Sequence, residues 1–546
     1  MNCIELIAKI LKREGVEWMA CYPSNPLIEA VAKEGIRPIA FRHERGAVMA
    51  ADGFSRTSDR QRFGVVAIQA QAGAENALGG VAQAYADNIP ILVLPGGVNL
   101  DQIAVRPNYS AARSYRDVVK TVEAIYRPEQ ITAVMRRAFS ALRNGVGGPV
   151  VVELTSDVCA GDTPESDAGY KPPRAMRQAP EAAAVEQAAR ALLGAKRAVI
   201  WAGAGVLFAR ATAELRELAE LTATPVFTTM PGKSAFDERH PLSLGAGSGA
   251  TTGQAHQWLQ SCDLLLAIGS SLTRSPYGQK VRAEAFLIQN TDNPDEINKN
   301  ESVDIGLPGD ALLTLRALID AVRSELGSKT RDAAPVAQEI ATMRAAWYAQ
   351  WEPLLNSDNT PLSTYRVIQE IDRTLDRENS IVTHDAGAPR DSIIPFYTAT
   401  TPHSYIGWGK TTHLGFGIPL MIGAKLAHPD RFCLNLMGDG AFGMSGTDLE
   451  TAVRARTPIT TVLLNNGGMA TYPGGFPTAR REYGVSQMNG DYAKIAEGMG
   501  AVGITVREVA QMAPALVEAQ RLNGEGETVL IDVHSDMEGR RSRWDR

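Results

Sequence analysis

The amino-acid sequence predicts an α/β protein with three doubly wound parallel-sheet domains. Short apolar runs such as GVVAIQA, PILVLPG and PVVVEL alternate with helix-forming stretches, as they do in a parallel sheet covered by helices. With 546 residues, the chain is too long for a single hydrophobic core, so several domains are expected. Residues 431–464 read as strand, helix and strand, and the crossover of such a βαβ unit makes its two strands parallel.

Three blocks of this kind follow one another along the chain. The first covers residues 1–160, and the polar, proline-containing stretch after it, 161–180, is expected to be a linker. The second block, 183–326, contains the strand-like runs RAVIWAGAG, TPVFTTM, DLLLAIGSS and AFLIQNT. A charged helical connection leads to the third block, 361–534, which is followed by a basic tail, 535–546. The first and third blocks are candidates for distant versions of one fold.

Composition and charge argue against several classes of protein. A net charge of −6 provides no general attraction to nucleic acid or to membranes, so neither partner is expected. No apolar run approaches the roughly 20 residues of a membrane-spanning helix, and the start, MNCIELIAKILKREG, reads as an amphipathic helix rather than a signal peptide. The five cysteines are odd in number and form no CxxC pair, which suits a reducing compartment. The expected location is the cytoplasm.

Polar residues follow both strands of the unit at 431–464. The run RFCLNLM stops at Gly438 and is followed by Asp439, and the run ITTVLL is followed by Asn465 and Asn466. Because the carboxyl ends of parallel strands meet at one sheet edge, we expect these side chains to lie close together. A carboxylate and an amide oxygen suit a Mg²⁺ that takes its other oxygens from phosphates and water. Either segment alone is compatible with an ordinary turn, but the pair indicates a holder for a metal diphosphate.

A capping box predicts where the helix of the βαβ unit starts. Thr447 and Glu450 fit this motif, so the helix is expected to begin there and to end before Pro458.

In the second block, GAGV at 203–206 follows a strand, but a dinucleotide fingerprint would need a third glycine where Phe208 stands. A tight strand-to-helix turn is therefore the better interpretation of this segment.

A second informative stretch is FRHERGAVMAADGFSR, at residues 41–56. It follows the strand-like run IRPIAF and continues as an alanine-rich helix, which places Glu44 at a strand-to-helix junction. A solvated charge at the positive end of the helix dipole is one interpretation of this glutamate. However, the stretch resembles, nearly position by position, the H-E-x-x-A…A-x-G-[YF]-[AS]-R segment of the acetolactate synthase and pyruvate oxidase branch of thiamine-diphosphate enzymes. The GDG…NN pair at 438–466 resembles the diphosphate signature of the same enzymes.

The resemblance extends over essentially the whole chain. The segment AQAGAENALGGVAQAYADNIPILVLPG is similar to the family's S-G-P-G-A-T-N segment with its following helix and strand. VTHDAGAPR is similar to the T-D-x-G segment, and HLGFGIPLMIGA to the M-G-x-x-L-P-x-A-x-G-A helix. The resemblance implies a pyrimidine-binding domain, a central domain and a diphosphate-binding domain, in that order. It also implies a homodimer or homotetramer, because in this family the cofactor lies between domains of two subunits.

The resemblance assigns chemical roles to three residues. Glu44 would hydrogen-bond the pyrimidine ring of thiamine diphosphate and favour the tautomer that removes the thiazolium C2 proton. Leu414 stands where the family places a bulky apolar side chain, often Met, under the bend of the cofactor, and Leu conserves that volume. The backbone carbonyl of Thr412 would receive the 4′-amino group.

The remaining site candidates also come from the resemblance. The ligands of Mg²⁺ would be Asp439, Asn466 and the carbonyl of Gly468. The cofactor would further be bound by Gly387, Ala388, Gly438, Gly440, Ala441 and Met469. The catalytic candidates beside Glu44 and Leu414 are His43 and Gln71.

The chain departs from the family pattern around the substrate pocket. CYPSNP stands in place of a glycine-rich segment and QAGAEN in place of G-P-G-A-T-N, so Tyr22, Asn25 and Gln71 are expected to shape an unusual pocket. Glu75 replaces a small polar residue, and His43 has no second histidine beside it, unlike the His pair of pyruvate decarboxylases.

A loop after the two asparagines offers further pocket candidates. GGMATYPGGFPTARREYG, at 467–484, is rich in glycine, proline and aromatic residues. Met469, Tyr472 and Phe476 are its candidate pocket residues, and an ordinary surface loop is the alternative.

These features favour an acetolactate-synthase-like carboligase, in which a 2-oxo acid is decarboxylated on thiamine and the acyl carbanion passes to a second carbonyl. The main alternative is a lyase or decarboxylase acting on an acyl-CoA, as in the 2-hydroxyacyl-CoA and oxalyl-CoA branch. In that case Arg540, Arg541 and Arg543 would fold over the site and meet phosphates, although a disordered tail is the favoured interpretation. A noncatalytic paralogue acting as a binding partner is a third hypothesis, against which Glu44 and Asp439 argue. Whether the central domain holds FAD, ADP or nothing stays open.

Overall fold

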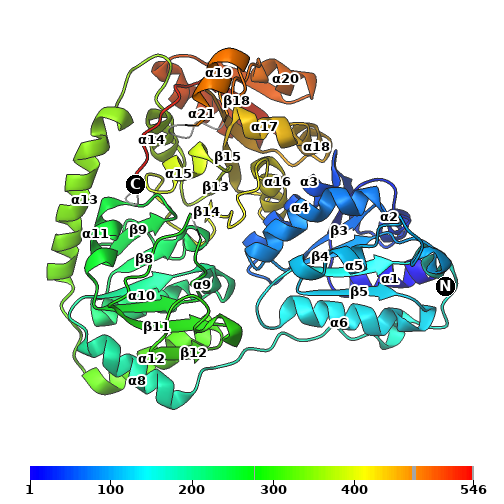
Figure 1. The fold of residues 1–546 in the computed structure, drawn as a ribbon, viewed down its shortest axis with the longest axis horizontal. Helices are drawn as coiled ribbons and strands as arrows, with labels where there is room; N and C mark the ends of the chain where they lie inside the picture. Colours follow the sequence, from blue (N-terminus) through cyan, green and yellow to red (C-terminus); the bar gives the residue numbers. More distant parts are fainter. Residues whose placement is uncertain (276, 470–474, 544–546) are drawn as a thin grey trace.

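The computed structural model describes residues 1–275, 277–469 and 475–543, which form three α/β domains (Figure 1). Each domain contains one six-stranded sheet, and the strand pairs of all three sheets are parallel. The fold class predicted from the sequence, three doubly wound parallel sheets, is confirmed. No helix among the described residues is long and apolar enough to cross a membrane.

The first domain has the strand order β2-β1-β3-β4-β6-β5. Its strands are β1 (Trp18–Cys21), β2 (Arg37–Ala40), β3 (Gly64–Ile68), β4 (Ile91–Pro95), β5 (Thr121–Ile125) and β6 (Val150–Leu154). Its helices are α1 (Cys3–Arg13), α2 (Leu27–Lys33), α3 (Glu44–Thr57), α4 (Ala72–Ala86), α5 (Ala111–Ser114), α6 (Ile131–Arg143) and α7 (Ser156–Ala160). The order reverses between β1 and β3, and ligands bind at the carboxyl ends of strands at such a switch point.

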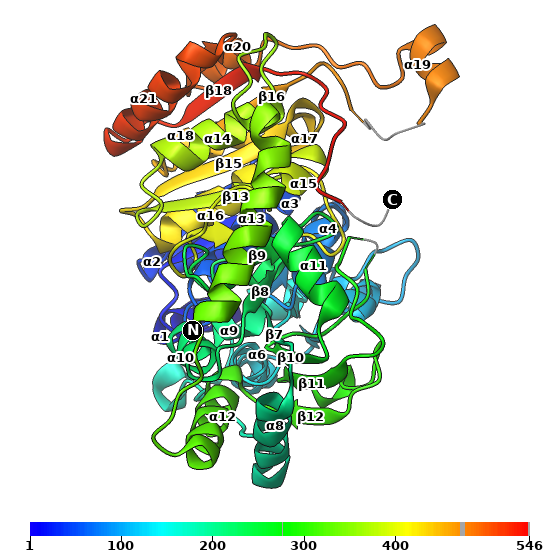
Figure 2. The ribbon, with the colours of Figure 1, turned by 90° about the vertical axis from the view of Figure 1, so that its left-hand side faces the viewer.

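The central domain has the strand order β12-β11-β10-β7-β8-β9, with its switch point between β7 and β10. Its strands are β7 (Ala198–Ala202), β8 (Val226–Thr229), β9 (Ser243–Gly247), β10 (Leu264–Ile268), β11 (Phe286–Thr291) and β12 (Ile305–Pro308). Its helices are α8 (Ala182–Gly194), α9 (Ala204–Phe208), α10 (Thr212–Thr222), α11 (Gly253–Ser261) and α12 (Ala311–Leu326). The long helix α13 (Ala334–Leu355) then runs beside the central domain to the third domain (Figure 2).

The third domain has the strand order β14-β13-β15-β16-β18-β17, which repeats the order of the first domain. Its strands are β13 (Ser380–His384), β14 (Tyr405–Ile406), β15 (Phe432–Gly438), β16 (Thr460–Asn465), β17 (Val502–Val506) and β18 (Val529–His534). Its helices are α14 (Thr364–Thr374), α15 (Ala388–Ile393), α16 (Gly417–Ala427), α17 (Asp439–Ser445), α18 (Asp448–Arg454), α19 (Pro477–Tyr483), α20 (Tyr492–Gly498) and α21 (Met512–Gly524). The shared order supports the view that these two domains are versions of one fold.

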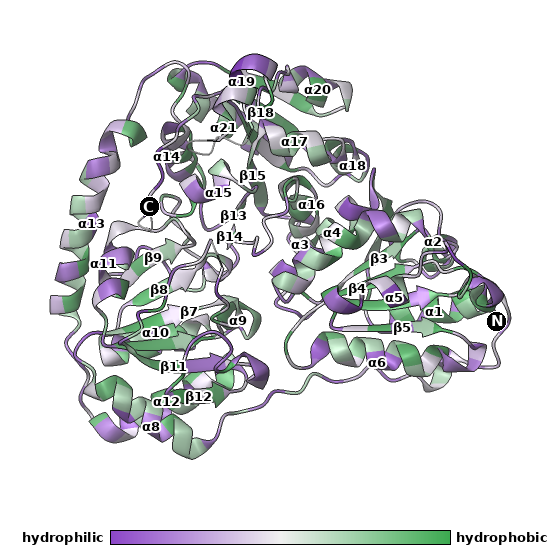
Figure 3. Ribbon diagram, viewed as in Figure 1, coloured by the Kyte–Doolittle hydropathy of each residue, from purple (hydrophilic) through white to green (hydrophobic). Residues whose placement is uncertain are grey.

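Apolar strands form the core of each domain, and helices α3 and α16 join the first core to the third. Figure 3 shows hydrophobic residues concentrated in the sheets and hydrophilic ones on the outer helices. A Cβ on Gly53 would overlap the carbonyl oxygen of Leu420, and one on Gly423 would overlap that of Ala50. The two helices therefore touch through their backbones, and one continuous cluster of buried side chains spans both domains.

The helix of the βαβ unit differs from its prediction. Two helices, α17 and α18, connect β15 to β16, and the first begins at Asp439 itself. Thr447 has a helical backbone conformation and makes no capping hydrogen bond through its side chain, so the predicted capping box is wrong. The reason is that the chain turns helical directly after the strand, so that Thr447 lies between two helices rather than in front of the first.

The C-terminal tail is ordered through residue 543, and the interpretation of a disordered tail is wrong. The Arg540 guanidinium stacks on the Trp351 ring at 4.1 Å. The Ser542 hydroxyl donates a hydrogen bond to the carbonyl of Thr251 at 2.6 Å. The tail packs because it crosses from the third domain to the central domain over buried aromatic side chains, which the basic composition alone does not reveal.

Candidate active site

Asp439 lies at the switch point of the third domain, where β15 ends. Its side chain is buried, and burial raises its pKa, while hydrogen bonds from backbone N–H groups lower it. The Oδ1 atom accepts the N–H of Gly440 at 2.8 Å and the Oδ2 atom that of Gly467 at 3.0 Å. No ion pair to Asp439 is present among the residues that the structure describes, so this buried carboxylate lacks a cation. A divalent metal ion would supply that charge.

Asn466 belongs to the same loop as Gly467. Its Oδ1 atom accepts the N–H of Gly468 at 3.0 Å. The neighbouring Asn465 instead donates its amide to Asp532 Oδ1 at 3.0 Å, away from this loop. The described residues contain no cluster of three or more His, Cys, Asp or Glu that could enclose a metal. One carboxylate with one amide therefore fits Mg²⁺ completed by phosphate and water oxygens, the coordination that this ion prefers.

Open backbone borders this loop where a diphosphate would lie. Gly387 has a φ of 86°, and a Cβ there would meet no atom of the described residues within 4 Å. Gly438 is similarly open: among the residues that the structure describes, a Cβ there would meet only Pro389, at 4.0 Å. Gly440, in contrast, is covered by Met469, whose Sδ lies 3.0 Å from an added Cβ. The residues present thus leave room for a bulky anion beside Gly387, which precedes α15 and Ala388.

The loop between β14 and α16 carries Thr412 and Leu414. Thr412 has a φ of 54°, and Leu414 is partly buried against the core shared by the first and third domains. Asp385, fully buried after β13, accepts the N–H of Gly415 at 3.0 Å and of Gly417 at 2.9 Å. Burial raises the pKa of Asp385 to about 6. The sequence reasoning did not single out Asp385, although its place in the T-D-x-G segment was a signal.

Glu44 lies at the carboxyl edge of the first sheet, as predicted from its junction between β2 and α3. It is 3% exposed and accepts a hydrogen bond from Asn76 Nδ2 at 3.1 Å. His43 is the N-cap of α3: its Nδ1 accepts the N–H of Arg45 at 3.1 Å and lies 3.9 Å from the Glu44 carboxylate. Burial lowers the pKa of His43. Gln71, the exposed N-cap of α4, has a φ of 53°, a conformation that favours glycine.

The pocket candidates differ in their surroundings. The Asn25 amide donates to the carbonyls of Ile68 at 3.0 Å and Leu94 at 3.2 Å, so its side chain is engaged in holding strand ends together. Phe476 is 57% exposed, and α19 after it has no buried residue. Tyr472 lies outside the described residues.

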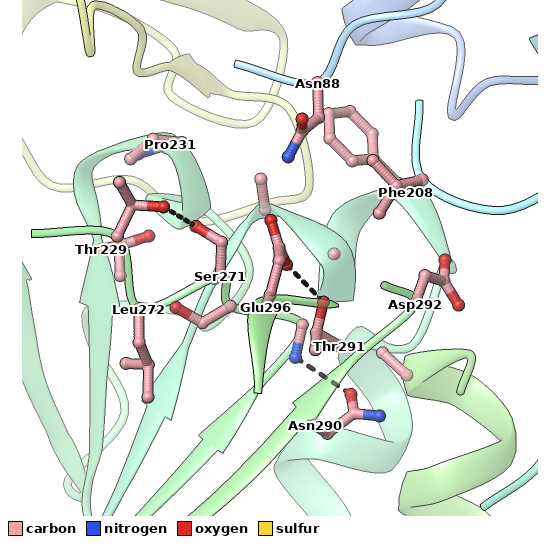
Figure 4. A pocket seen from close by; sticks show the side chains of 18 of the residues that line it. Asn88, Phe208, Thr229, Pro231, Ser271, Leu272, Asn290, Thr291, Asp292 and Glu296 are labelled. Carbon is pink, nitrogen blue, oxygen red and sulfur yellow. Dashed lines mark hydrogen bonds between the residues drawn. The ribbon is translucent and has the colours of Figure 1, made fainter. Parts of the chain in front are cut away.

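A cavity of about 920 Å³ lies between the three domains, at the switch point of the central sheet (Figure 4). Figure 4 shows Asn88 of the first domain and Phe208 of α9 on one side of it, with Asn290 and Thr291 of β11 below. It is also lined by Gly203, Gly205, Gly269 and Lys410.

The glycines of this cavity explain the GAGV segment. A Cβ on Gly203 or Gly205 would clash with the backbone of Gly269, so the turns after β7 and β10 are in direct contact. The tight strand-to-helix turn predicted for GAGV is confirmed.

Known protein families match the chain in three segments, one in each domain. Three family models match the chain, described as the thiamine pyrophosphate enzyme N-terminal TPP binding domain (residues 1–117), central domain (185–318) and C-terminal TPP binding domain (385–533). The probable acetolactate synthase large subunit of Methanocaldococcus jannaschii is 30% identical over 98% of this chain and 92% of its own. The Escherichia coli acetolactate synthase isozyme 3 large subunit is 27% identical, over 97% and 94%. The mitochondrial acetolactate synthase catalytic subunit of Saccharomyces cerevisiae is 28% identical, over 97% and 80%.

The shared strand order of the first and third domains and three matching family models in the same chain order define a thiamine-diphosphate-binding protein. The full-length relatives narrow the class: the chain belongs to the acetolactate synthase and pyruvate oxidase family of thiamine-diphosphate-dependent enzymes. The prediction of such an enzyme from the sequence motifs is confirmed.

Proposed function

We propose that the protein is an acetolactate-synthase-like carboligase. A 2-oxo acid, pyruvate or a close relative, loses CO₂, and its acyl group is joined to the carbonyl carbon of a second substrate. The observation that supports this function is a relative named as a probable acetolactate synthase large subunit that matches 98% of the chain, together with Glu44, Asp439 and Asn466 all in place. Bound thiamine diphosphate supplies the electron sink for breaking a bond beside a carbonyl.

The third domain holds the metal and the diphosphate in this proposal. Mg²⁺ would be bound by Asp439, Asn466 and the carbonyl of Gly468, because these hard oxygens follow the neighbouring strands β15 and β16, and Asp439 accepts the N–H of Gly467 at 3.0 Å. The diphosphate would be held beside Gly387, where a Cβ would meet no described residue within 4 Å, and the resemblance adds Ala388, Gly438, Gly440, Ala441 and Met469 as residues that would bind it. These residues bind and orient the cofactor.

The first domain and the loop before α16 hold the reacting part of the cofactor. Glu44 would hydrogen-bond the pyrimidine ring and assist its proton exchange, and Asn76, which donates to Glu44 at 3.1 Å, orients the carboxylate. The Thr412 carbonyl would receive the 4′-amino group, and Leu414 would support the bend of the cofactor. His43 and Gln71 would border the substrate, and burial lowers the pKa of His43.

The test is turnover of the purified protein with Mg²⁺, thiamine diphosphate and pyruvate. Release of CO₂ with formation of a hydroxyketone supports the carboligase, and the Asp439→Ala variant serves as the inactive control. Absence of turnover with a panel of 2-oxo acids, combined with cleavage of a 2-hydroxyacyl-CoA or oxalyl-CoA, would replace the proposal with the CoA-thioester function.

The structure offers the CoA-thioester alternative no added support from the tail. Arg540 stacks on Trp351, Arg541 donates to two backbone carbonyls, and Arg543 lies 3.5 Å from Asp391. Arg540 and Arg543 thus hold the tail against the protein, whereas the two carbonyls bonded to Arg541, those of Glu538 and Arg540, belong to the tail itself. We therefore propose no second activity.

The proposed assembly is a homodimer or homotetramer whose sites are shared between subunits. Its support is the family pattern, in which the two thiamine-binding domains of one site come from different chains. Complementation tests it: chains carrying Glu44→Gln are unfolded together with chains carrying Asp439→Ala and refolded as mixed oligomers. If sites are shared, each mixed dimer regains one intact site and activity returns. If each chain forms its own site, the mixture stays inactive.

The central cavity is proposed to hold a nucleotide such as FAD or ADP. Its support is the position at a switch point, where dinucleotides bind in such sheets, and a volume of about 920 Å³. A flavin absorbance band in the purified protein would identify FAD, and mass analysis of the released ligand would identify ADP. Purified, active protein with no nucleotide bound would contradict the proposal.

A further inference from the structure

Asp87, a buried carboxylate at the border of the central cavity, connects the first domain to the loop that carries Thr412 and Leu414. It is the C-cap of α4, and its side chain has no exposed surface. Its Oδ2 atom accepts the backbone N–H of Gly409 at 3.1 Å, and its Oδ1 atom accepts that of Lys410 at 3.3 Å. Both oxygens of one carboxylate thus hold successive residues of a loop in another domain.

Neighbouring polar side chains of α3 and α4 extend this contact along the loop. Arg56 and Gln83 donate to Asp87 Oδ2 at 3.1 and 2.9 Å. Arg56 also donates to the carbonyl of Gly407 at 3.3 Å, and Gln83 accepts the hydroxyl of Thr411 at 2.5 Å. Four loop residues are therefore held by three side chains of the first domain, with Asp87 at the centre.

The loop depends on such contacts because its backbone is irregular. No helix or strand lies between Ile406 and Gly417. Gly409 has a φ of 113° and Thr412 a φ of 54°, and the left-handed region is strained for a β-branched residue such as threonine. Strained conformations persist only where surrounding contacts enforce them.

We propose that Asp87 is a positioning residue for the cofactor site: by fixing Gly409 and Lys410, it sets where the Thr412 carbonyl and Leu414 meet the thiamine ring. The inference rests on the cofactor roles proposed for those two residues. Asn at this position would keep the volume of the side chain but replace one acceptor oxygen by an NH₂ donor. This NH₂ group would then oppose one of the N–H donors that Asp87 binds, and the hydrogen bond would be lost. Displacement by about 1 Å at a reacting centre costs about 100-fold in rate.

The experiment compares Asp87→Asn with a matched control, Asp52→Asn. The side chain of Asp52 likewise has no exposed surface and pairs with the same Arg56 at 2.8 Å, but it makes no hydrogen bond to loop residues 407–416. Proton exchange at C2 of thiamine diphosphate is followed by NMR at saturating cofactor and Mg²⁺, without substrate, and thermal unfolding reports the fold. Asp87→Asn is expected to slow exchange about 10- to 100-fold, whereas Asp52→Asn keeps the wild-type exchange even if it unfolds at a lower temperature.

Three results would overturn the inference. If proton exchange at C2 is unchanged in Asp87→Asn, Asp87 does not position the loop. If exchange slows equally in Asp87→Asn and Asp52→Asn, Asp87 contributes to the stability of the buried cluster and has no specific effect on the cofactor site. A wild-type protein that does not accelerate exchange over free cofactor overturns the proposed site, and this inference with it. If Asp87→Asn does not fold, Thr411→Val, which removes only the loop hydroxyl bonded to Gln83, is measured instead: slower exchange supports the inference and unchanged exchange overturns it.

Discussion

The first and third domains share one strand order but present different chemistry at the same edge of the sheet. In the third domain, the switch point between β13 and β15 places Gly387 beside Asp439, an open glycine next to a buried carboxylate. In the first domain, the equivalent point between β1 and β3 is followed by Tyr22 and the uncharged Gln71. One edge therefore suits a metal and phosphates, while the other has no carboxylate directly after β1 or β3, and its carboxylate, Glu44, comes from the start of α3.

The comparison also holds for the second strand of each sheet. After β2 the chain turns directly into α3 with Glu44 as its first residue, whereas after β14 a long loop precedes α16. The first arrangement places a single carboxylate at the edge of the sheet. The second places there the backbone carbonyl of Thr412 and the apolar side chain of Leu414. The topology thus sets where a ligand is bound, and the residues following each strand set what is bound there.

The largest expected effect is at the switch point of the third domain. Asp439→Ala should abolish Mg²⁺-dependent binding of thiamine diphosphate while the protein stays folded, with a loss beyond the roughly 10- to 100-fold caused by removing outer partners of a metal. Calorimetric titration measures it. The control is Asn465→Ala, a neighbouring strand-end residue that donates to Asp532 and should keep cofactor binding. If Asp439→Ala binds thiamine diphosphate with unchanged affinity, the sheet edge of the third domain is not the metal and phosphate site that distinguishes it from the edge of the first domain.

The second effect is catalytic and lies in the first domain. Glu44→Gln nearly conserves volume but cannot stabilise the protonated pyrimidine, so exchange at thiamine C2 should slow by about 10²- to 10⁴-fold. Affinity for the cofactor should change far less, because Glu44 contributes no metal ligand. NMR measurement of C2 proton exchange and calorimetric titration of the cofactor, on the same samples, separate the effect on exchange from the effect on affinity. A variant with wild-type exchange would return Glu44 to the role of a helix-start charge.

A smaller effect concerns the contact between the two domains. Gly423→Ala places a methyl group against the Ala50 carbonyl, so it should destabilise the protein by about 1–3 kcal/mol, as overpacking does. Gly524→Ala, in α21 with nothing within 4 Å, should be neutral or slightly stabilising because alanine favours helices. Denaturant unfolding compares them, and equal stabilities would mean that α3 and α16 do not pack backbone to backbone.

The smallest effect tests the strained residue at the first switch point. Gln71→Gly removes a left-handed conformation that is costly for glutamine, offset in part by the entropy of glycine, so a gain of about 1 kcal/mol is expected. Gln71→Ala keeps the strain and should show no such gain. A higher unfolding temperature for the alanine variant than for the glycine variant would contradict the strain at this position.

Local patterns were enough to locate the main site candidates. Asp439 and Glu44 each follow an apolar run within a few residues, so their placement at sheet edges needs only the alternation of strands and helices. The family resemblance then added their roles. At Thr447 the same reasoning was right about the start of α18, whose N-cap position is Thr447, but wrong about the capping hydrogen bond and about the earlier helix that begins at Asp439.

Contacts between distant parts of the chain could be seen only in the folded molecule. Asp87 holds Gly409 although 322 positions separate them, and Ser542 is bonded to Thr251 across 291 positions. The residues around Asp87 and the composition of the basic tail do not predict these partners, because a hydrogen bond between domains produces no periodic pattern in the sequence. Its geometry is set by how α3, α4 and α16 pack, and that packing depends on close backbone approach at Gly53 and Gly423.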